Sequence, residues 1–386
     1  MLIYVCVSTH GYGHAARQAA VLIQLHRLQP DWQLVISSSV DETFLALVLR
    51  HVPVSRRTVR WDVGMLQADA LGVDQQATLQ ALQQLENALP QLVQREVDWI
   101  REQDSQCVVL ADIPPAAAQL ARQLDAPLVW MGNFGWDEIY APLGGAFVDW
   151  ANKATSAYQS GALLLRCPLS LPMNWSLPEQ ALGLVSADPE ALPLDLERRL
   201  RADGRTKVLV GFGGLGYSLQ SDLFKRWPQH LFLMPAPKDS RQLEQLDQIA
   251  NVLLLPETIR FLDVMPFCER LLGKPGFSSF CEAMSCGVAL HVVERQGFAE
   301  ASVLMDGLRS HADHRILSRQ SLESGEWKLD QPLEPAAGSP LSAGGATQAA
   351  EAIRLVAINT VKQLSLIHIS EPTRQEAISY AVFCLK

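Results

Sequence analysis

The amino-acid sequence predicts an α/β protein built from two doubly wound parallel sheets, one in each half of the chain. Three observations predict it. The chain has 386 residues, which is long for one α/β domain and comfortable for two. Apolar strand-like runs alternate with helical patterns in both halves, as in parallel sheets covered by helices. Each half also opens with an apolar strand that runs into a glycine-rich loop.

In the first half, we expect strands at 2–8, 32–40, 107–112 and 127–131, with a helix at about 14–28 between the first two. Residues 77–102 contain leucines at helical spacing and predict a long amphipathic helix. Pro90 lies inside that pattern, and we expect it to kink or split the helix.

The second half restarts the pattern after a proline-rich stretch at 166–204, which we interpret as an interdomain connection. Strands are expected at 207–210, 230–234, 252–255, 270–273 and 289–293, and a closing helix at 346–362. The predicted domains are therefore 1–165 and 205–363. Residues 364–386 resemble the translation of a sequencing-library adapter, so we expect a non-native tail and leave it out of the fold.

Composition excludes several classes of protein. The net charge of −9, without a basic stripe, argues against a nucleic-acid partner. Uninterrupted apolar runs stay below eighteen residues and the N-terminus enters a strand directly, so we expect neither a spanning helix nor a signal peptide. The seven cysteines are scattered without a CxxC pair, which favours free thiols in a cytoplasmic protein.

Both glycine loops follow predicted strands and precede predicted helices. Glycine lets a ligand approach the backbone closely, and the amides at a helix N-terminus suit a phosphate. A tight turn without a ligand is the alternative for either loop. A dinucleotide site would also want an acid directly after the second strand, and Asp41 comes too late for that. The loop glycines are Gly11 and Gly13, followed by Ala16, and Gly211, Gly213 and Gly216.

The segment GKPGFSSFCEAMSCGV at 273–288 resembles the donor-binding signature of inverting glycosyltransferases with two facing Rossmann-like domains, the GT-B architecture. The resemblance implies a nucleotide-sugar site in an interdomain cleft, with Glu282 holding the ribose hydroxyls. A carboxylate can accept both hydroxyls, although a glutamate near a helix start is also favoured by the helix dipole alone. It further implies that Glu300 meets the transferred sugar. Gly276, Ser278 and Ser279 complete the donor residues in this segment.

A second resemblance covers nearly the whole natural chain. Segments 9–17, 62–69, 133–140 and 273–276 look like the glycosyltransferase-like N-terminal half of plant-type L-arabinokinases and its stand-alone bacterial relatives. The sugar-kinase half of those fusions is absent from this sequence, so no kinase activity is expected.

His14 and Asp112 are the candidate catalytic residues. Sugar transfer to a hydroxyl needs a base, and an imidazole that titrates near neutrality suits that task. Related transferases carry a histidine after the first strand, and Asp112 matches the position of its acidic partner. Parallel strands end at one edge, so the two side chains could meet there. His10 competes for the role of base, and His14 could instead cap its helix or bind a phosphate.

The acceptor side is predicted from the stretch 133–140, which is dense in aromatic and polar residues. Aromatic faces stack on sugars, and amide and carboxylate groups bond their hydroxyls. A packed strand-to-helix turn is the alternative. The acceptor candidates are His10, Asn133, Trp136 and Asp137; Gly213, Gly214 and Gly216, helped by Ser218, are expected to cradle the diphosphate.

The sequence therefore predicts a glycosyltransferase that uses a nucleotide sugar, UDP-linked by resemblance, and needs neither a metal nor another cofactor. We expect small-molecule donor and acceptor partners, no nucleic acid, and at most peripheral contact with a membrane. A non-catalytic nucleotide-sugar-binding or regulatory protein and a nucleotide-sugar epimerase of the same architecture are the alternatives.

Overall fold

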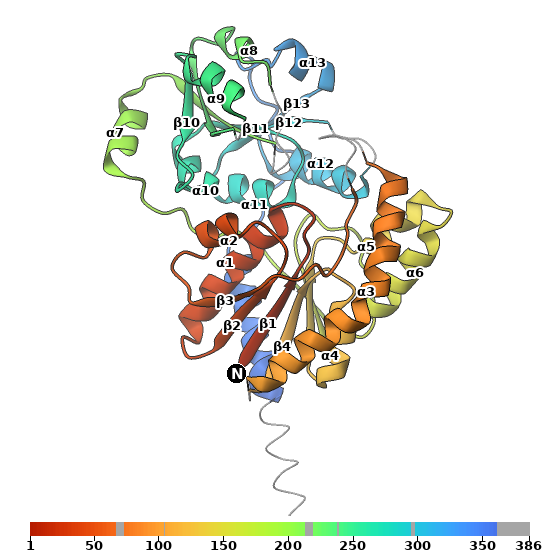
Figure 1. Ribbon diagram of the computed structural model, residues 1–386. Coiled ribbons are helices and arrows are strands. Elements are labelled where there is room, and N and C mark those ends of the chain that lie inside the picture. The colour runs from red at the N-terminus through yellow and green to blue at the C-terminus, as the bar shows by residue number, and fades with distance from the viewer. Residues whose placement is uncertain (67–72, 104, 213–218, 238, 295–297, 361–386) are drawn as a thin grey trace, which may run out of the picture.

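The computed structural model describes residues 1–66, 73–103, 105–212, 219–237, 239–294 and 298–360. Two α/β halves, each built on one parallel sheet, lie one above the other with helices between them (Figure 1). This confirms the α/β architecture with two sheets that the sequence predicts.

In the described part of the first half, seven parallel strands form a sheet in the order β3-β2-β1-β4-β5-β6-β7. The strand β1 is buried at every residue, which explains its uninterrupted apolar run. The strands are β1 (Leu2–Val7), β2 (Gln33–Ser37), β3 (Val54–Arg57), β4 (Cys107–Asp112), β5 (Leu128–Gly132), β6 (Leu163–Arg166) and β7 (Glu179–Ala181).

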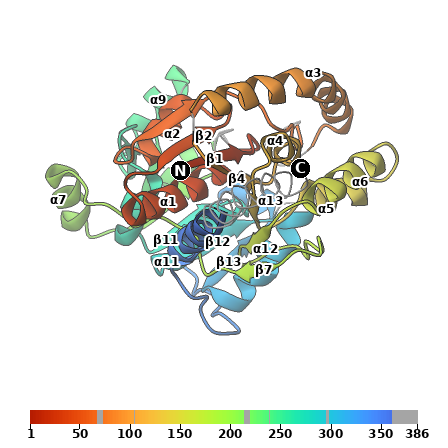
Figure 2. The same cartoon turned by 90° about the horizontal axis from the view of Figure 1, so that it is seen from below.

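Helices cover both faces of this sheet (Figure 2). Alternate residues of β1 divide between the two cores: Leu2 and Tyr4 pack with the α3 and α4 side, and Ile3 and Val5 with the α1 and α2 side. The helices are α1 (Gly13–Leu28), α2 (Glu42–Val48), α3 (Gln75–Glu102), α4 (Ala117–Leu124), α5 (Trp136–Tyr140) and α6 (Phe147–Tyr158).

In the described part of the second half, six parallel strands follow the order β10-β9-β8-β11-β12-β13. They are β8 (Thr206–Gly211), β9 (His230–Pro235), β10 (Val252–Leu255), β11 (Arg270–Gly273), β12 (Ala289–Val293) and β13 (His314–Leu317). The helices here are α8 (Asp222–Lys225), α9 (Ser240–Asp247), α10 (Phe261–Val264), α11 (Phe277–Ser285), α12 (Ala299–His311) and α13 (Arg319–Ser324).

Several elements differ from the expectation. The α3 helix is continuous, with Pro90 inside it, and it bends partway along its length (Figure 1), so it shows the expected kink rather than a split. Four short strands were not predicted: β3, β6, β7 and β13. The stretch 166–204 contains β7, which pairs with β6, and also α7 (Leu194–Ala202). All three residues of β7 are exposed, so no apolar pattern marks it in the sequence.

The closing helix, residues 345–360, returns to the first half of the molecule (Figure 1). Its residues Ala349 and Ile353 join the core beneath α1 together with Ile3 and Val5. The chain entering this helix is bonded to the segment after β7, because Leu184 N–H donates to the carbonyl of Ser342 at 2.7 Å.

Each sheet has a point at which its strand order reverses. In the first sheet this point lies between β1 and β4, and in the second between β8 and β11. Open parallel sheets bind ligands outside the carboxyl ends of the strands at such points. The loops that follow β1 and β11 carry the predicted site residues, so the fold presents both sets at the facing edges.

Candidate active site

The structure brings His14 and Asp112 into contact at the carboxyl edge of the first sheet. His14 is the second residue of α1, and Asp112 is the last residue of β4. The Nδ1 atom of His14 lies 2.7 Å from Oδ1 of Asp112, and both side chains are buried. The expected meeting of the two side chains is therefore found, while their catalytic roles stay predictions.

Arg17 grips the same carboxylate and was not singled out from the sequence. It lies three residues after His14, on the same face of α1. Its Nε donates to Oδ2 of Asp112 at 2.5 Å, and its Nη2 donates to Oδ1. Gln18 adds a bond from Nε2 to Oδ2 at 2.8 Å. The sequence did contain a signal for Arg17: a charged residue lies on the buried, alanine-rich face of the predicted helix, where it needs a partner.

The charges of this cluster hold Asp112 ionised. Burial alone would raise the pKa of Asp112, but the charge of Arg17 and the bonds from Arg17 and His14 outweigh it and lower that pKa well below its usual range. Burial would likewise lower the pKa of Arg17, whereas the charge and hydrogen bonds of Asp112 raise it. The site therefore contains a fixed carboxylate–guanidinium pair beside the imidazole.

Asn133 connects this cluster to the second half of the molecule. It follows β5 directly and is fully buried. Its Oδ1 accepts from Nη1 of Arg17 at 2.6 Å, and its Nδ2 donates to Oε1 of Glu300 at 2.7 Å. Glu300 lies in the first turn of α12, so a predicted acceptor residue and a predicted donor residue are bonded across the cleft.

The N-termini of α1 and α11 meet in the same cleft. Ser278 donates from Oγ to the carbonyl oxygen of Gly13 at 2.7 Å. A Cβ on Gly13 would lie 3.2 Å from that Oγ, so the absence of a side chain at Gly13 allows Ser278 to come this close. Neither helix has a side-chain cap: α1 begins after Tyr12 and α11 after Gly276. Their terminal amides are thus not taken by capping side chains, and Ser279 lies in the first turn of α11.

Glu282 lies one turn further along α11 and is partly buried. Burial raises the pKa of Glu282 to about 7; the charge of Asp263 acts in the same direction, and the charge of Arg260 opposes it. Among the described residues, none donates a hydrogen bond to its carboxylate, which leaves both oxygens able to accept.

Arg260 and Asp263 belong to a group of ion pairs between the halves, which we call the interdomain clasp: Arg50, Glu190, Arg260 and Asp263. Arg50, which follows α2, donates from Nη2 to Glu190 at 2.5 Å and to Asp263 at 3.1 Å. Arg260 pairs with Asp263 at 2.5 Å. The clasp ties the first half to the segment that carries α10.

His10 lies between aromatic rings of both halves. Its ring stacks on Phe298 at 5.5 Å and meets Trp136 edge-on at 5.3 Å. Its Nδ1 accepts from the backbone N–H of Met65 at 3.4 Å, which favours a proton on Nε2. Gly64 has φ +69° and a Cβ there would lie 2.7 Å from Nδ1, so a glycine is required beside this ring.

Trp136 supports the site from within. Its ring stacks on Tyr140 and its Nε1 donates to Oδ2 of Asp62 at 2.8 Å. Only 1% of the residue is exposed. The ring faces are thus covered by protein, and the geometry gives no support to the predicted stacking of Trp136 on a sugar. Asp62 also accepts from the backbone of Thr9 at 3.3 Å, and burial raises its pKa.

Asp137 is buried in the first half, where its partners are Trp175 and Thr155. Its Oδ2 accepts from Nε1 of Trp175 at 3.0 Å and from the hydroxyl of Thr155 at 3.3 Å. Burial raises its pKa. Asp137 thus serves the packed strand-to-helix turn, which was the alternative for this stretch, and we do not carry it into the site as an acceptor contact.

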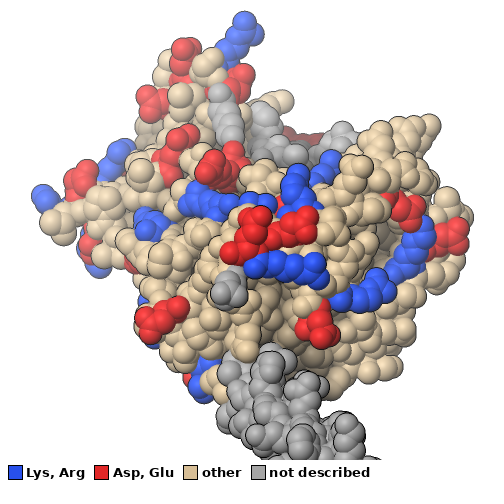
Figure 3. Space-filling view, turned by 60° about the horizontal axis from the view of Figure 1, so that its bottom comes forward, with Lys and Arg blue, Asp and Glu red and all other residues tan. Residues whose placement is uncertain are grey.

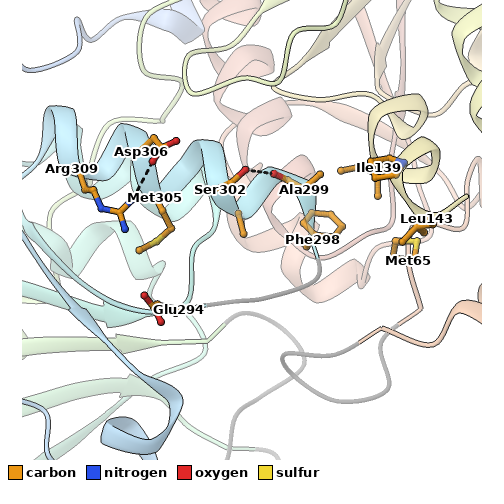
Figure 4. A pocket seen from close by; sticks show the side chains of 12 residues that line it. Met65, Ile139, Leu143, Glu294, Phe298, Ala299, Ser302, Met305, Asp306 and Arg309 are labelled. Atoms are coloured by element: carbon orange, nitrogen blue, oxygen red, sulfur yellow. Dashed lines mark hydrogen bonds and ion pairs between the residues drawn. The ribbon is translucent and has the colours of Figure 1, made fainter.

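A pocket of about 640 Å³ opens beside these residues, between α12 and the first half (Figure 4). Met65, Ile139 and Leu143 form one wall, and the other runs along α12 from Phe298 to Arg309. Apolar groups prevail near Phe298, whereas charged groups gather at the far end, where Arg309 pairs with Asp306 at 3.1 Å. The sequence analysis did not identify this pocket, because its walls come from segments far apart in the chain.

Four residues predicted to cradle the diphosphate lie outside the described residues, as does the predicted tail within 361–386. They are Gly213, Gly214, Gly216 and Ser218. The preceding strand end is described: a Cβ on Gly273 would lie 2.3 Å from the carbonyl oxygen of Gly211, so the ends of β8 and β11 approach closely.

The described residues contain no group of three or more His, Cys, Asp or Glu side chains placed to hold a metal ion. Within the same residues, none of the helices has the length and apolar character to cross a membrane. On the face seen in Figure 3, basic and acidic side chains are interspersed rather than gathered into a patch of one sign.

Comparison with solved structures identifies the architecture. A UDP-glucosyltransferase from Polygonum tinctorium that glucosylates indoxyl superposes with a TM-score of 0.59 at 12% identity, covering 93% of both chains. UGT2 of Phytolacca americana, solved with UDP-2-fluoro-glucose and pterostilbene, gives 0.58 at 13%, covering 92% and 94%. CalG4, the calicheamicin glycosyltransferase, gives 0.58 at 13%, covering 95% and 97%. The chain thus has the two-domain GT-B fold.

Sequence comparison finds a related plant protein. The chain is 27% identical to L-arabinokinase of Arabidopsis thaliana over 334 residues, which are 83% of this chain and 31% of that protein. The chain therefore spans about a third of the length of this relative. The expected resemblance to this protein is confirmed. No protein-family model matches the chain.

Proposed function

We propose that this protein is a glycosyltransferase that moves a sugar from a UDP-linked donor to a hydroxyl of a small acceptor. One observation carries the proposal: the His14–Asp112 pair of the first half and the N-terminal turn of α11 meet across one cleft, and the Asn133–Glu300 bond crosses it beside them. A base, an anion-binding helix start and a sugar-binding carboxylate are the three groups that transfer from a nucleotide sugar requires.

In the reaction we propose, Nε2 of His14 takes the proton of the acceptor hydroxyl. The acceptor oxygen then bonds to the anomeric carbon while the bond from that carbon to the diphosphate oxygen breaks. The imidazolium is stabilised by Asp112 through Nδ1. The leaving nucleoside diphosphate carries the negative charge away, and the amides at the starts of α1 and α11 meet that charge, so we infer no requirement for a metal.

For the donor, we assign the ribose hydroxyls to Glu282, whose two oxygens can both accept, and the transferred sugar to Glu300. Gly276, Ser278 and Ser279 would line the diphosphate together with Gly213, Gly214 and Gly216. A uridine donor is supported by the structural neighbours, several of which are described with UDP or a UDP sugar. On the acceptor side we retain His10 and Asn133, beside the pocket that ends at Phe298.

The test is a panel of UDP, GDP and dTDP sugars in a thermal-shift assay, followed by acceptor-dependent release of the nucleoside diphosphate. We expect UDP sugars to raise the melting temperature by mass action. His14→Ala should lower transfer about 10²- to 10⁴-fold while leaving donor binding intact. His311→Ala, at the far end of α12, is the matched control. Transfer by the His14→Ala variant at the wild-type rate would exclude His14 as the base.

A nucleotide-sugar-binding or regulatory protein without turnover is the second candidate. Ser278 and Glu300, which we predict to contact the nucleotide sugar, are already hydrogen-bonded to Gly13 and Asn133. A protein that only binds the nucleotide sugar could keep these bonds, because it needs no room for an acceptor to react. Incubation with the donor alone and then with acceptors separates the candidates. Binding without release of the nucleoside diphosphate supports the regulatory protein, and release or epimerisation without an acceptor supports a hydrolase or an epimerase.

We further infer a cytoplasmic location, since the described cysteines are free thiols, as is usual in a reducing compartment. The acidic net charge of −9 supports small-molecule partners rather than nucleic acid. Peripheral contact with a membrane remains compatible with this function, because an acceptor could be lipid-linked.

A further inference from the structure

An unbroken chain of hydrogen bonds runs from the candidate base to the candidate sugar-binding carboxylate, and Arg17 is its centre. The links are His14 Nδ1 to Asp112 at 2.7 Å, Arg17 Nε to Asp112 at 2.5 Å, Arg17 Nη1 to Asn133 at 2.6 Å, and Asn133 Nδ2 to Glu300 at 2.7 Å. Arg17 is 2% exposed, and its guanidinium also lies 5.0 Å from the centre of the Phe277 ring. Arg17 thus contacts groups from both halves.

The guanidinium fixes the direction of the link to Glu300. Arginine has five N–H donors and no acceptor, so the atom of Asn133 that faces Nη1 must be its oxygen. The amide nitrogen of Asn133 then points toward Glu300 and can only donate. At this end of the hydrogen-bond network, the Glu300 carboxylate therefore accepts from the Asn133 amide, and the orientation of that amide depends on Arg17.

The guanidinium also fixes the tautomer of His14. Because Asp112 is held ionised, its oxygens accept from every neighbour, and Nδ1 of His14 must carry a proton to approach Oδ1 at 2.7 Å. Nη2 of Arg17 also lies 2.9 Å from this Nδ1. If Nδ1 instead accepted a hydrogen bond from Nη2, it would carry no proton, and its lone pair would then face the negatively charged Oδ1 of Asp112. The favoured arrangement leaves the lone pair on Nε2, where a base needs it.

We propose that Arg17 is a positioning residue that couples the two halves of the site: through Asp112 it sets the tautomer of His14, and through Asn133 it orients Glu300. The catalytic part of this inference rests on the proposed transferase function, whereas the tautomer and the orientation of Asn133 do not. Burying a guanidinium–carboxylate pair adds little net stability, whereas it selects one geometry among the polar groups around it.

The first test reads the tautomer without any substrate. Nitrogen NMR of the imidazole rings, with His14 assigned through the His14→Ala variant, should show Nδ1 protonated and Nε2 unprotonated in the wild-type protein. Arg17→Met should change the populations of the two tautomers. Arg57→Met is the matched control, because Arg57 makes an equivalent pair with the buried Glu96 away from the cleft. It should lower the melting temperature and leave the His14 signals unchanged.

Since Arg17→Met leaves Asp112 buried without its cation and could fail to fold, Arg17→Lys provides a second route. Lysine keeps the charge, but its three donors radiate from one nitrogen and do not reproduce the planar fork that bonds both Asp112 oxygens and Asn133 from three nitrogens. Asn133→Asp breaks only the second arm, because the new oxygen would face the Glu300 carboxylate. We expect Asn133→Asp to preserve the His14 tautomer and to raise the donor KM, and Arg17→Lys to lower kcat as well.

The second test measures transfer in combination with His14→Ala. If Arg17 acts through His14, Arg17→Lys lowers kcat at least tenfold alone and less than about threefold in the His14→Ala background. Equal losses in both backgrounds, or an unchanged His14 tautomer in both Arg17 variants, would overturn the proposal. Absence of transfer by the wild-type protein with any donor would instead defeat the proposed function, and the tautomer test would still stand.

Discussion

Ser278 of α11 and Gly13 of α1 are joined by a hydrogen bond of 2.7 Å, although they lie in different halves of the molecule. The bond brings the positive ends of two helix dipoles toward one another. That approach is unfavourable by itself and becomes favourable when an anion lies near both helix starts. If the proposed donor site is correct, we therefore expect a bound diphosphate to strengthen this contact between the two halves.

The first prediction follows from that bond. Ser278→Ala should lower the stability of the protein by about 1 kcal/mol, because one partly buried hydrogen bond is lost. It should also weaken the binding of UDP by several-fold, because a hydroxyl is removed from the anion site. Thermal unfolding with and without UDP measures both effects. Ser285→Ala, at the exposed far end of the same helix, is the control. An unchanged UDP affinity for Ser278→Ala would remove Ser278 from the donor site.

The second prediction concerns the buried carboxylate. Asp112→Asn should cost about 3–5 kcal/mol at pH 7, because Arg17 is left buried without its counter-charge. The folded-state pKa of Asp112 lies below the unfolded value of about 3.9, so its contribution is fully present above that pH and is lost as the pH falls through the folded value. Urea unfolding at pH 7 and pH 3.5 should therefore show a smaller difference at the lower pH.

Asp31→Asn on the exposed surface is the control for that experiment, and we expect it to change stability little at either pH. A difference between Asp112→Asn and the wild-type protein that stays constant from pH 7 to pH 3.5 would contradict the assignment of an ionised Asp112.

Much of the fold could be predicted from the sequence because buried parallel strands are continuous apolar runs. The strand β1 and the strand β4 were located in this way, and the loops after them followed. The strand β7 could not be found, since its three residues are exposed and it depends on pairing with β6. Pro90 could be used because a proline inside a helix removes a backbone hydrogen bond and favours a bend, and α3 is bent partway along its length (Figure 1).

The residues of the candidate site that follow or end a strand could likewise be predicted, whereas those defined by distant contacts could not. His14 and Asp112 were found because each ends or follows a strand at one sheet edge. Arg17 was missed because its importance comes from three partners that lie far away in sequence, at positions 112, 133 and, through Asn133, 300. Asp137 was predicted on the acceptor side from composition, which does not show which way a polar side chain turns, and here it turns toward Trp175.

The third prediction tests the interdomain clasp. Arg50→Met removes a cation that bonds Glu190 and Asp263, while Asp263 keeps Arg260. We expect a loss of about 1–2 kcal/mol, smaller at high salt because the pair is partly exposed. X-ray scattering should show a larger radius of gyration, since the halves are tied less tightly. Arg56→Met, whose partner Glu42 is 86% exposed, is the control; equal effects of the two variants would argue against the clasp.

The fourth prediction concerns Glu282, whose pKa is raised to about 7. A folded-state pKa above the unfolded value means that ionisation costs stability, and the cost develops as the pH rises from about 4.5 to 7. Glu282→Gln should therefore match the wild-type protein at about pH 4, below the unfolded pKa, and exceed it by roughly 1 kcal/mol at pH 8, allowing for partial exposure. Denaturant unfolding at the two pH values measures the difference.

The same variant should bind the donor more weakly, since an amide offers one accepting oxygen where the carboxylate offers two. For the wild-type protein, we expect donor affinity to fall as the pH drops below 7, because Glu282 then gains a proton. Calorimetric titration with UDP from pH 6 to pH 8 tests this. Glu326→Gln, on an exposed loop, should keep the wild-type profile. A donor affinity independent of pH and of this substitution would remove Glu282 from the site.

The last prediction concerns Asp62, which accepts hydrogen bonds from Nε1 of Trp136 and from the backbone of Thr9. In Asp62→Asn the new amide nitrogen must face one of these two donors, so we expect a loss of about 1–3 kcal/mol. Thr9 precedes His10, and Trp136 contacts the His10 ring, so the substitution should make the His10 side chain more mobile. The acceptor KM should then rise several-fold while donor affinity stays unchanged. Asp149→Asn, exposed on α6, should alter neither quantity, and a changed donor affinity in Asp62→Asn would assign Asp62 to the donor side.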